Sequence, residues 1–111
     1  MQDAKEYRLV LTTAGSEDQA ITIARALVEE RLAACVNIVG GGCSIYRWEG
    51  KIEEEDERIL LIKTSLELLP KLREAIRRLH SYDVPEMLAL PIAEGDPPYL
   101  EWLAGSLRSE G

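Results

Sequence analysis

The sequence has little of the chemistry on which most active sites depend. Its 111 residues contain one histidine, two cysteines and no phenylalanine. A nucleophile and its base cannot be drawn from so small a set, so we expect no enzyme. Cys35 and Cys43 match no zinc-binding spacing, and in one extended strand they are too far apart for a disulfide. We therefore expect reduced thiols and a cytoplasmic protein.

Long apolar runs and an excess of positive charge are also missing. The longest apolar run, residues 87–93, contains Pro91 and is far shorter than the roughly 20 residues of a membrane span. The first six residues alternate in charge, which predicts no signal peptide. Twenty acidic residues against thirteen basic residues give a net charge of -7. This charge disfavours nucleic acid and anionic membranes as partners.

The residues that are present fit one folded domain. A chain of 111 residues with 46% hydrophobic side chains can bury one core, so we treat residues 1–111 as a single domain. Charged side chains make up 30% of the sequence, which favours a thermostable protein.

Three segments carry the signals of helices. Ser16 and Gln19 form a capping box, after which apolar residues recur at helical spacing until residues 32–34. The same spacing predicts a second helix over residues 66–79. An Asp-Pro pair opens a short third helix over residues 96–107.

Four segments are predicted as strands. The continuous apolar run at residues 7–13 is typical of a strand buried on both faces. The strand at residues 87–92 contains Pro91, which places it at a sheet edge or a bulge. Between them, residues 35–48, interrupted by three glycines, and the residues after Lys51 form a long hairpin.

The hairpin turn at Glu49–Gly50 determines which residues face each other. A two-residue turn with continuous register pairs Ile38 with Leu61, so that the apolar ends of the two strands meet. A β-bulge at the glycines would shift this register.

The predicted order is strand, helix, strand, strand, helix, strand and a short helix. This is the order of a split βαβ, or ferredoxin-like, fold. We therefore predict the α+β class, with an antiparallel sheet and two helices on one of its faces. Because this fold carries many functions, it does not indicate the activity.

Four separated segments carry a family resemblance. They are Leu-Ala-Ala-Cys-Val-Asn-Ile at residues 32–38, Ser-Ile-Tyr-Arg-Trp-Glu-Gly-Lys at residues 44–51, His-Ser-Tyr-Asp-Val-Pro-Glu at residues 80–86 and Tyr-Leu-Glu-Trp-Leu at residues 99–103. In this order they resemble the CutA divalent-cation tolerance family. The resemblance implies a cytoplasmic homotrimer of ferredoxin-like subunits, linked to tolerance of copper and other divalent metals. The resemblance does not imply a catalysed reaction. It does imply an architecture similar to that of the trimeric PII signalling proteins.

The resemblance also allows a comparison with the copper-binding site of some family members. The copper site ascribed to some family members uses a cysteine in the first strand and two adjacent histidines. The matching positions here are Thr12, Leu79 and His80, so only one strong ligand is kept.

His80, Asp83 and Glu86 are the candidate metal ligands. They lie in one predicted turn, and one imidazole with two carboxylates suits zinc or copper(II). Neighbouring subunits of a trimer could add further ligands. The alternative is a surface histidine that caps the C-terminal end of the second helix.

The hairpin carries the candidate contacts between subunits. We predict Tyr46, Trp48 and Lys51 as trimer-interface residues, because a long hairpin needs a partner and tryptophan is a frequent interface anchor. The alternative for Trp48 is a residue that stacks on a ligand. Residues 53–57 are all acidic, and we interpret them as a solvated arm because adjacent strand residues face opposite sides.

One principal hypothesis and two alternatives follow. The principal hypothesis is a cytosolic, trimeric divalent-cation tolerance protein that binds copper or other divalent metal ions and requires no cofactor. The first alternative is a PII-like sensor that binds a small metabolite in clefts between subunits. The second is a structural trimer without a ligand.

Overall fold

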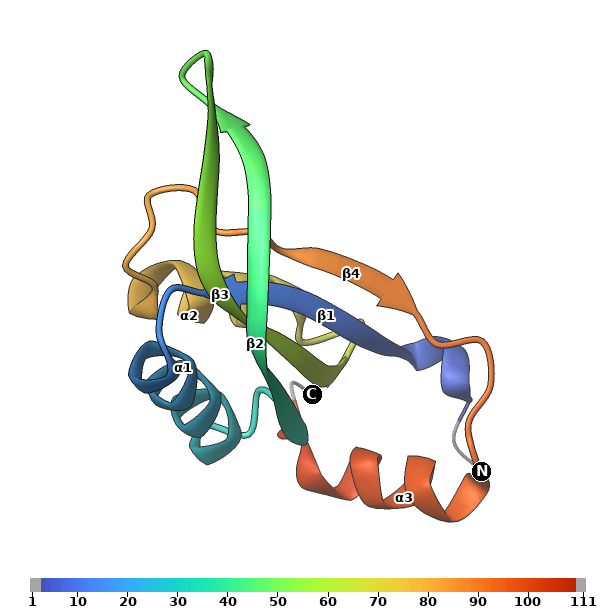
Figure 1. Cartoon of the computed structure of the whole chain (residues 1–111). Coiled ribbons are helices and arrows are strands. Elements are labelled where there is room, and N and C mark those ends of the chain that lie inside the picture. Colours follow the sequence, from blue (N-terminus) through green and yellow to red (C-terminus); the bar gives the residue numbers. More distant parts are fainter. Residues whose placement is uncertain (1–2, 110–111) are drawn as a thin grey trace.

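The computed structural model describes residues 3–109 and shows the predicted order of strands and helices (Figure 1). The elements are the 3-10 helix η1 (Ala4–Glu6), strand β1 (Tyr7–Ala14), helix α1 (Glu17–Glu29), strands β2 (Cys35–Trp48) and β3 (Lys51–Ser65), helix α2 (Leu69–Leu79), strand β4 (Leu88–Pro91) and helix α3 (Pro97–Ser106). Within these residues, every helix is too short or too polar to span a bilayer.

Helix α1 begins at the predicted cap and ends before the predicted residue. Ser16 Oγ accepts a hydrogen bond from Gln19 N at 3.1 Å, as the capping box requires. The helix stops at Glu29 because Arg31 adopts a left-handed backbone with φ of 58°. The prediction of a helix up to residues 32–34 is therefore wrong.

Helix α2 begins later than predicted and ends where predicted. Residues 66–68 form a turn in which Leu68 N donates to Ser65 Oγ at 3.2 Å, so the helix starts at Leu69. At the other end, His80 is the C-cap residue, and its backbone N–H donates to Ile76 O. The end of α2 therefore fixes where the following loop begins.

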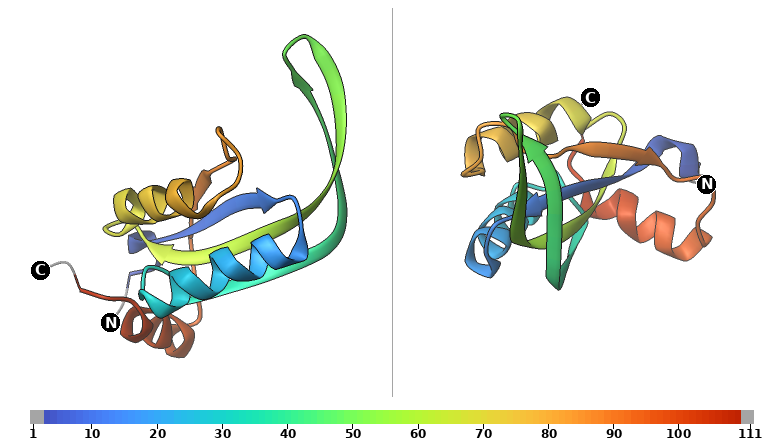
Figure 2. Two further views of the ribbon diagram at one scale, coloured as in Figure 1. Left: turned by 90° about the vertical axis from the view of Figure 1, so that its left-hand side faces the viewer. Right: turned by 45° about the horizontal axis from the view of Figure 1, so that its top comes forward.

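The four strands form one antiparallel sheet in the order β2-β3-β1-β4. Helices α1 and α2 cover one face of the sheet, and the main core lies between them and the sheet (Figure 2). Its fully buried members include Val10, Ile23, Leu60, Ile62 and Ile76. The predicted α+β, ferredoxin-like class is thus confirmed, and β4 lies at the edge that Pro91 indicated.

The hairpin of β2 and β3 projects beyond the rest of the sheet (Figures 1 and 2). Its tip has the predicted register, but below the glycines Ile38 pairs with Leu60 and not with the predicted Leu61. The register shifts at the three glycines, where Gly41 adopts a φ of 74° that glycine tolerates. The continuous register is therefore wrong, because the bulge adds one residue to β2.

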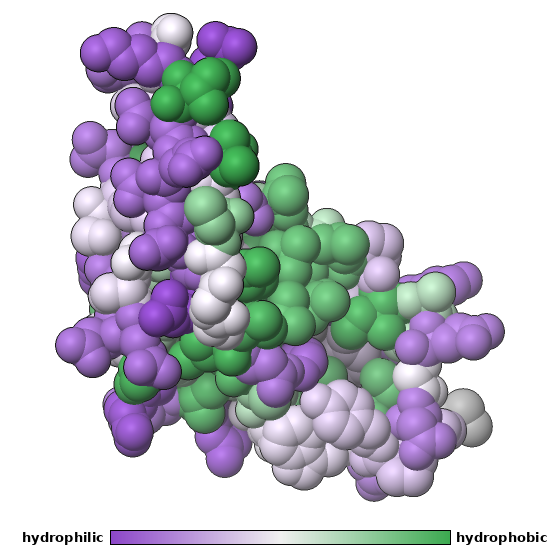
Figure 3. Space-filling model, in the orientation of Figure 1, coloured by the Kyte–Doolittle hydropathy of each residue, from purple (hydrophilic) through white to green (hydrophobic). Residues whose placement is uncertain are grey.

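The sheet face opposite α1 and α2 is apolar and only partly covered. We call it the open face, and it consists of Leu9, Leu11, Val39, Ile59, Leu61, Leu88 and Leu90. Figure 3 shows the apolar surface that results on this side of the molecule. Helix α3 covers only one end, where Leu100 and Leu103 pack with Tyr7. A surface of this kind on a single chain indicates an interaction site.

Candidate functional site

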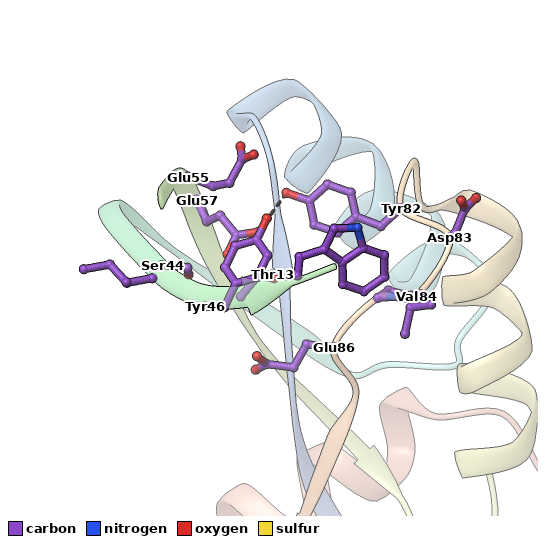
Figure 4. Close-up of a pocket in the computed structure, with 12 residues that line it drawn as sticks. Thr13, Ser44, Tyr46, Glu55, Glu57, Tyr82, Asp83, Val84 and Glu86 are labelled. Carbon is purple, nitrogen blue, oxygen red and sulfur yellow. Dashed lines mark hydrogen bonds between the residues drawn. The ribbon is translucent and has the colours of Figure 1, made fainter. Parts of the chain in front are cut away.

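A cavity of about 630 Å³ lies between the hairpin and the loop that joins α2 to β4 (Figure 4). It is lined by Thr13, Ser44, Ile45, Tyr46, Trp48, Glu55, Glu57, Tyr82, Asp83, Val84, Pro85 and Glu86. Four of these side chains are carboxylic acids, three are aromatic and none is basic. We call this space the acidic cavity.

Strand alternation explains most of the hairpin residues that line the acidic cavity, with Ile45 as the exception. Ser44, Tyr46 and Trp48 of β2 are two residues apart, so they lie on one side of the hairpin. Ser44 pairs with Glu55 across the hairpin, which puts Glu55 and Glu57 of β3 on the same side. The hairpin therefore supplies both aromatic and acidic side chains to one wall of the acidic cavity.

Glu57 is a buried carboxylate held by a tyrosine from the loop after α2. It is 6% exposed, and its Oε2 accepts a hydrogen bond from Tyr82 Oη at 2.7 Å. Burial, and then this hydrogen bond, raise the pKa of Tyr82 well above its ordinary value. A Cβ on Gly15 would lie 3.0 Å from Tyr82 Oη, so a glycine here leaves room for the phenol. The interpretation of residues 53–57 as a fully solvated arm is therefore wrong for Glu57.

His80 is buried, and both of its ring nitrogens have backbone partners. Nε2 lies 2.5 Å from Thr13 O, and Nδ1 accepts a hydrogen bond from Tyr82 N at 3.1 Å. These partners require a proton on Nε2 and a lone pair on Nδ1. The ring also stacks at a tilt on Tyr82, with ring centroids 4.5 Å apart. The alternative of a surface histidine at the end of the second helix is therefore right in position, since His80 is the C-cap residue of α2, but wrong in exposure, since the side chain is a buried link between β1 and the loop after α2.

The candidate ligands do not form a metal site within one chain. In the part of the chain that the structure describes, no three His, Cys, Asp or Glu side chains are placed to hold a metal ion. Asp83 and Glu86 are exposed at the acidic cavity and point in different directions (Figure 4). Together with the two occupied nitrogens of His80, this geometry does not fit a resident metal in a single subunit.

A profile of the CutA1 divalent ion tolerance protein family matches residues 8–106. The chain belongs to this family. The CutA1 assignment rests on most of the described chain, and it confirms the resemblance of the four sequence segments.

Individual CutA relatives agree with the family profile. The divalent-cation tolerance protein CutA of Thermus thermophilus is 60% identical over 95 residues, which are 86% of this chain and 92% of that protein. A solved structure of the T. thermophilus protein has a TM-score of 0.90 and 56% identity, covering 92% of this chain and 99% of that chain. The chloroplastic CutA protein of Arabidopsis thaliana is 46% identical over 101 residues, or 91% of this chain and 56% of that protein. The chain spans about half the length of the plant and mammalian CutA proteins it matches.

The three predicted interface residues of this CutA1 chain are exposed near the hairpin tip. Tyr46 is 40% and Trp48 is 48% exposed, and Trp48 pairs with the exposed Lys51 across the turn. Their contacts with other subunits stay a prediction. The structure adds that Tyr46 and Trp48 also line the acidic cavity, which the sequence alone indicated only as an alternative for Trp48.

We expect Tyr82→Phe to lower the free energy of unfolding by about 2 kcal/mol near neutral pH, because the buried Glu57 carboxylate loses its hydroxyl partner. The folded chain keeps the Tyr82 proton at pH values at which an unfolded tyrosine, with a pKa of about 10, loses it. The stabilisation of the fold by the Tyr82 hydroxyl is therefore complete below about pH 10, and it is lost as the pH rises further. Urea unfolding at about pH 8 and about pH 11 measures this difference between the two proteins.

The control for this experiment is Tyr99→Phe in α3. Tyr99 is 43% exposed, and phenylalanine would keep its ring contact with Trp102, whose centroid is 5.5 Å away, so we expect little change in stability near neutral pH. A Tyr82→Phe difference that is equally large at both pH values would contradict the role of the hydroxyl proton.

Proposed function

We propose that this chain acts in the tolerance of divalent metal ions, as a cytoplasmic homotrimer that binds copper or another divalent ion without catalysing a reaction. The T. thermophilus relative is named as a divalent-cation tolerance protein, which supports this role. The observation that carries the proposal is the pair of exposed carboxylates, Asp83 and Glu86, at a cavity without any basic lining residue. A PII-like metabolite sensor is not favoured, because the family and the relatives carry the tolerance name.

The open face supports assembly into a trimer. Four of its side chains are exposed in the single chain, with Leu88 at 57%, Val39 at 47%, Leu90 at 42% and Ile59 at 38%. Water-exposed apolar area of this kind is stabilised when another copy covers it. Neighbouring copies would also pair with or shield the sheet edge at β4.

In this proposal the metal ion is a ligand that the protein binds and releases. Carboxylate oxygens suit divalent cations, and the exposed position of Asp83 and Glu86 allows water or a neighbouring subunit to complete the coordination. His80 could ligate only after losing its bonds to Thr13 and Tyr82. We therefore assign the exposed carboxylates the larger part in binding.

Calorimetric titration with copper(II) and zinc tests this assignment. We expect the double variant Asp83→Asn/Glu86→Gln to weaken metal affinity about tenfold, because the negative charge that attracts the ion to this cavity falls by two. The matched double variant Glu67→Gln/Glu74→Gln removes the same charge from an exposed surface elsewhere and should bind as the wild type does. No binding by the wild type would contradict metal binding and favour a structural trimer. Equal affinity of the two double variants would contradict the ligand assignment.

A further inference from the structure

A second cavity, of about 550 Å³, lies where the C-terminal end of α3 meets the start of β1 and the turn before α2. We call it the α3 cavity. None of its lining residues belongs to the open face or to the hairpin tip, so the proposed contacts between subunits do not involve it. It is also separate from the acidic cavity, with which it shares no lining residue.

Arg108 contributes a half-buried guanidinium to the lining of the α3 cavity. Its Nε is buried, and within residues 3–109 this N–H has no hydrogen-bond partner. The guanidinium forms no ion pair with these residues either. A buried donor without an acceptor is costly, so native proteins rarely leave one unsatisfied. An unpartnered N–H of a charged group beside a cavity therefore indicates an anionic ligand that accepts a hydrogen bond.

The fold holds the backbone of Arg108 in place. Leu107 packs against both hydrophobic clusters, and Arg108 N donates to Arg31 O at 2.9 Å. A second donor in the lining is Ser65, whose Oγ accepts from Leu68 N at 3.2 Å. The hydroxyl proton is not used in that bond, so Ser65 can still donate to a ligand.

Apolar side chains line the α3 cavity beside these donors. Leu66 is 50% exposed, and it lines the cavity together with Ala104 and Leu107. An exposed leucine next to a guanidinium favours an organic anion with an apolar part over an inorganic ion, because burial of the leucine stabilises the complex.

The remaining charges of the lining limit the charge of the ligand. Lys5, Glu6 and Glu67 are all exposed, so water and salt screen their interactions with a ligand. The two carboxylates still repel an anion, and they repel a multiply charged phosphate more strongly than a single carboxylate. The lining therefore favours a ligand with one negative charge.

We infer that the α3 cavity binds a small organic monocarboxylate, whose carboxylate accepts a hydrogen bond from Arg108 and whose apolar part lies against Leu66. A volume of about 550 Å³ accommodates a ligand of this size. The inference goes beyond metal tolerance, because it concerns an anionic ligand and depends on neither Asp83 nor Glu86.

Calorimetric titration of the 111-residue chain with sodium octanoate tests the inference. The comparison ligand is n-octanol, which has the same alkyl chain and no charge. We expect saturable binding of octanoate, with an affinity at least about tenfold higher than that of octanol. Arg108→Gln keeps the backbone bond to Arg31 and removes the charged donor, so it should weaken octanoate binding by at least about tenfold.

Matched variants make the result specific. Arg73→Gln removes the same charge from the exposed face of α2 and should bind octanoate as the wild type does. Glu67→Gln removes a negative charge from the lining and should bind octanoate at least as tightly as the wild type. Absence of saturable binding by the wild type, equal affinity of Arg108→Gln, or equal affinity for octanol would overturn the inference. Asp83→Asn/Glu86→Gln should retain octanoate binding, so that a failure of the metal proposal is recognised separately.

Discussion

We expect Leu88→Glu to convert the proposed trimer into monomers. Leu88 is 57% exposed in the single chain and lies on the open face beside Leu11, so the substitution hardly affects the fold of one subunit. In an assembly that buries the open face, the new carboxylate would be placed in an apolar interface without a partner. A loss of about 4 kcal/mol per interface corresponds to a roughly thousandfold weaker association. Sedimentation equilibrium over a range of protein concentrations measures the change.

The matched control for Leu88→Glu is Ile21→Glu. Ile21 is 42% exposed on α1, which packs on the other side of the sheet, so the same side-chain change there should leave the assembly intact. A monomeric wild type would contradict the trimer itself. A trimeric Leu88→Glu protein would show that the copies meet through another surface.

We expect His80→Ala to reduce the stability of the fold by about 3 kcal/mol per chain. The imidazole connects Thr13 O at the end of β1 with Tyr82 N in the loop after α2, and it is only 9% exposed. Its removal leaves a carbonyl and an amide without these partners, and each such buried loss costs about 1–3 kcal/mol. The midpoint of thermal unfolding at equal protein concentration should fall by about 10 °C.

His80→Gln separates the structural role of this residue from a role as a metal ligand. A glutamine amide can replace the hydrogen bond to Thr13, so we expect an intermediate thermal midpoint. Copper(II) affinity measured at a temperature at which both variants are folded should remain near that of the wild type. A stable His80→Ala protein that has lost copper binding would contradict the structural assignment and restore His80 as a ligand.

Local sequence signals predicted the start of α1 and the hairpin turn, but not the end of α1 or the strand register below the glycines. The Ser16 capping box and the two-residue hairpin turn are short-range features, because each depends on residues within one or two turns of backbone. The end of α1 depends on the left-handed conformation of Arg31, which a non-glycine residue rarely adopts. The register below the glycines depends on a bulge whose position follows from how two long strands pack.

Residue types predicted the candidate site only in part. The sequence predicts functional roles for His80, Asp83, Glu86, Tyr46 and Trp48, but the structure groups Asp83 and Glu86 with Tyr46 and Trp48 around the cavity and leaves His80 outside its lining. His80 is hydrogen-bonded to backbone groups, and the buried carboxylate among the lining residues is Glu57. Five consecutive acids gave no signal that one of them is buried, since burial depends on what packs against each face.

The sequence by itself determined the order of strands and helices, the ferredoxin-like class and the membership of the CutA1 family. Hydrophobic periodicity and turn-forming residues are local properties, because each depends on residues that are close together in the sequence. Only the tertiary structure decided that Glu57 meets Tyr82, 25 residues away, and that His80 meets Thr13, 67 residues away. These contacts arise when the sheet forms and the loop after α2 folds onto it. The single histidine and the excess of acid therefore acquire their roles from the fold and not from their positions in the chain.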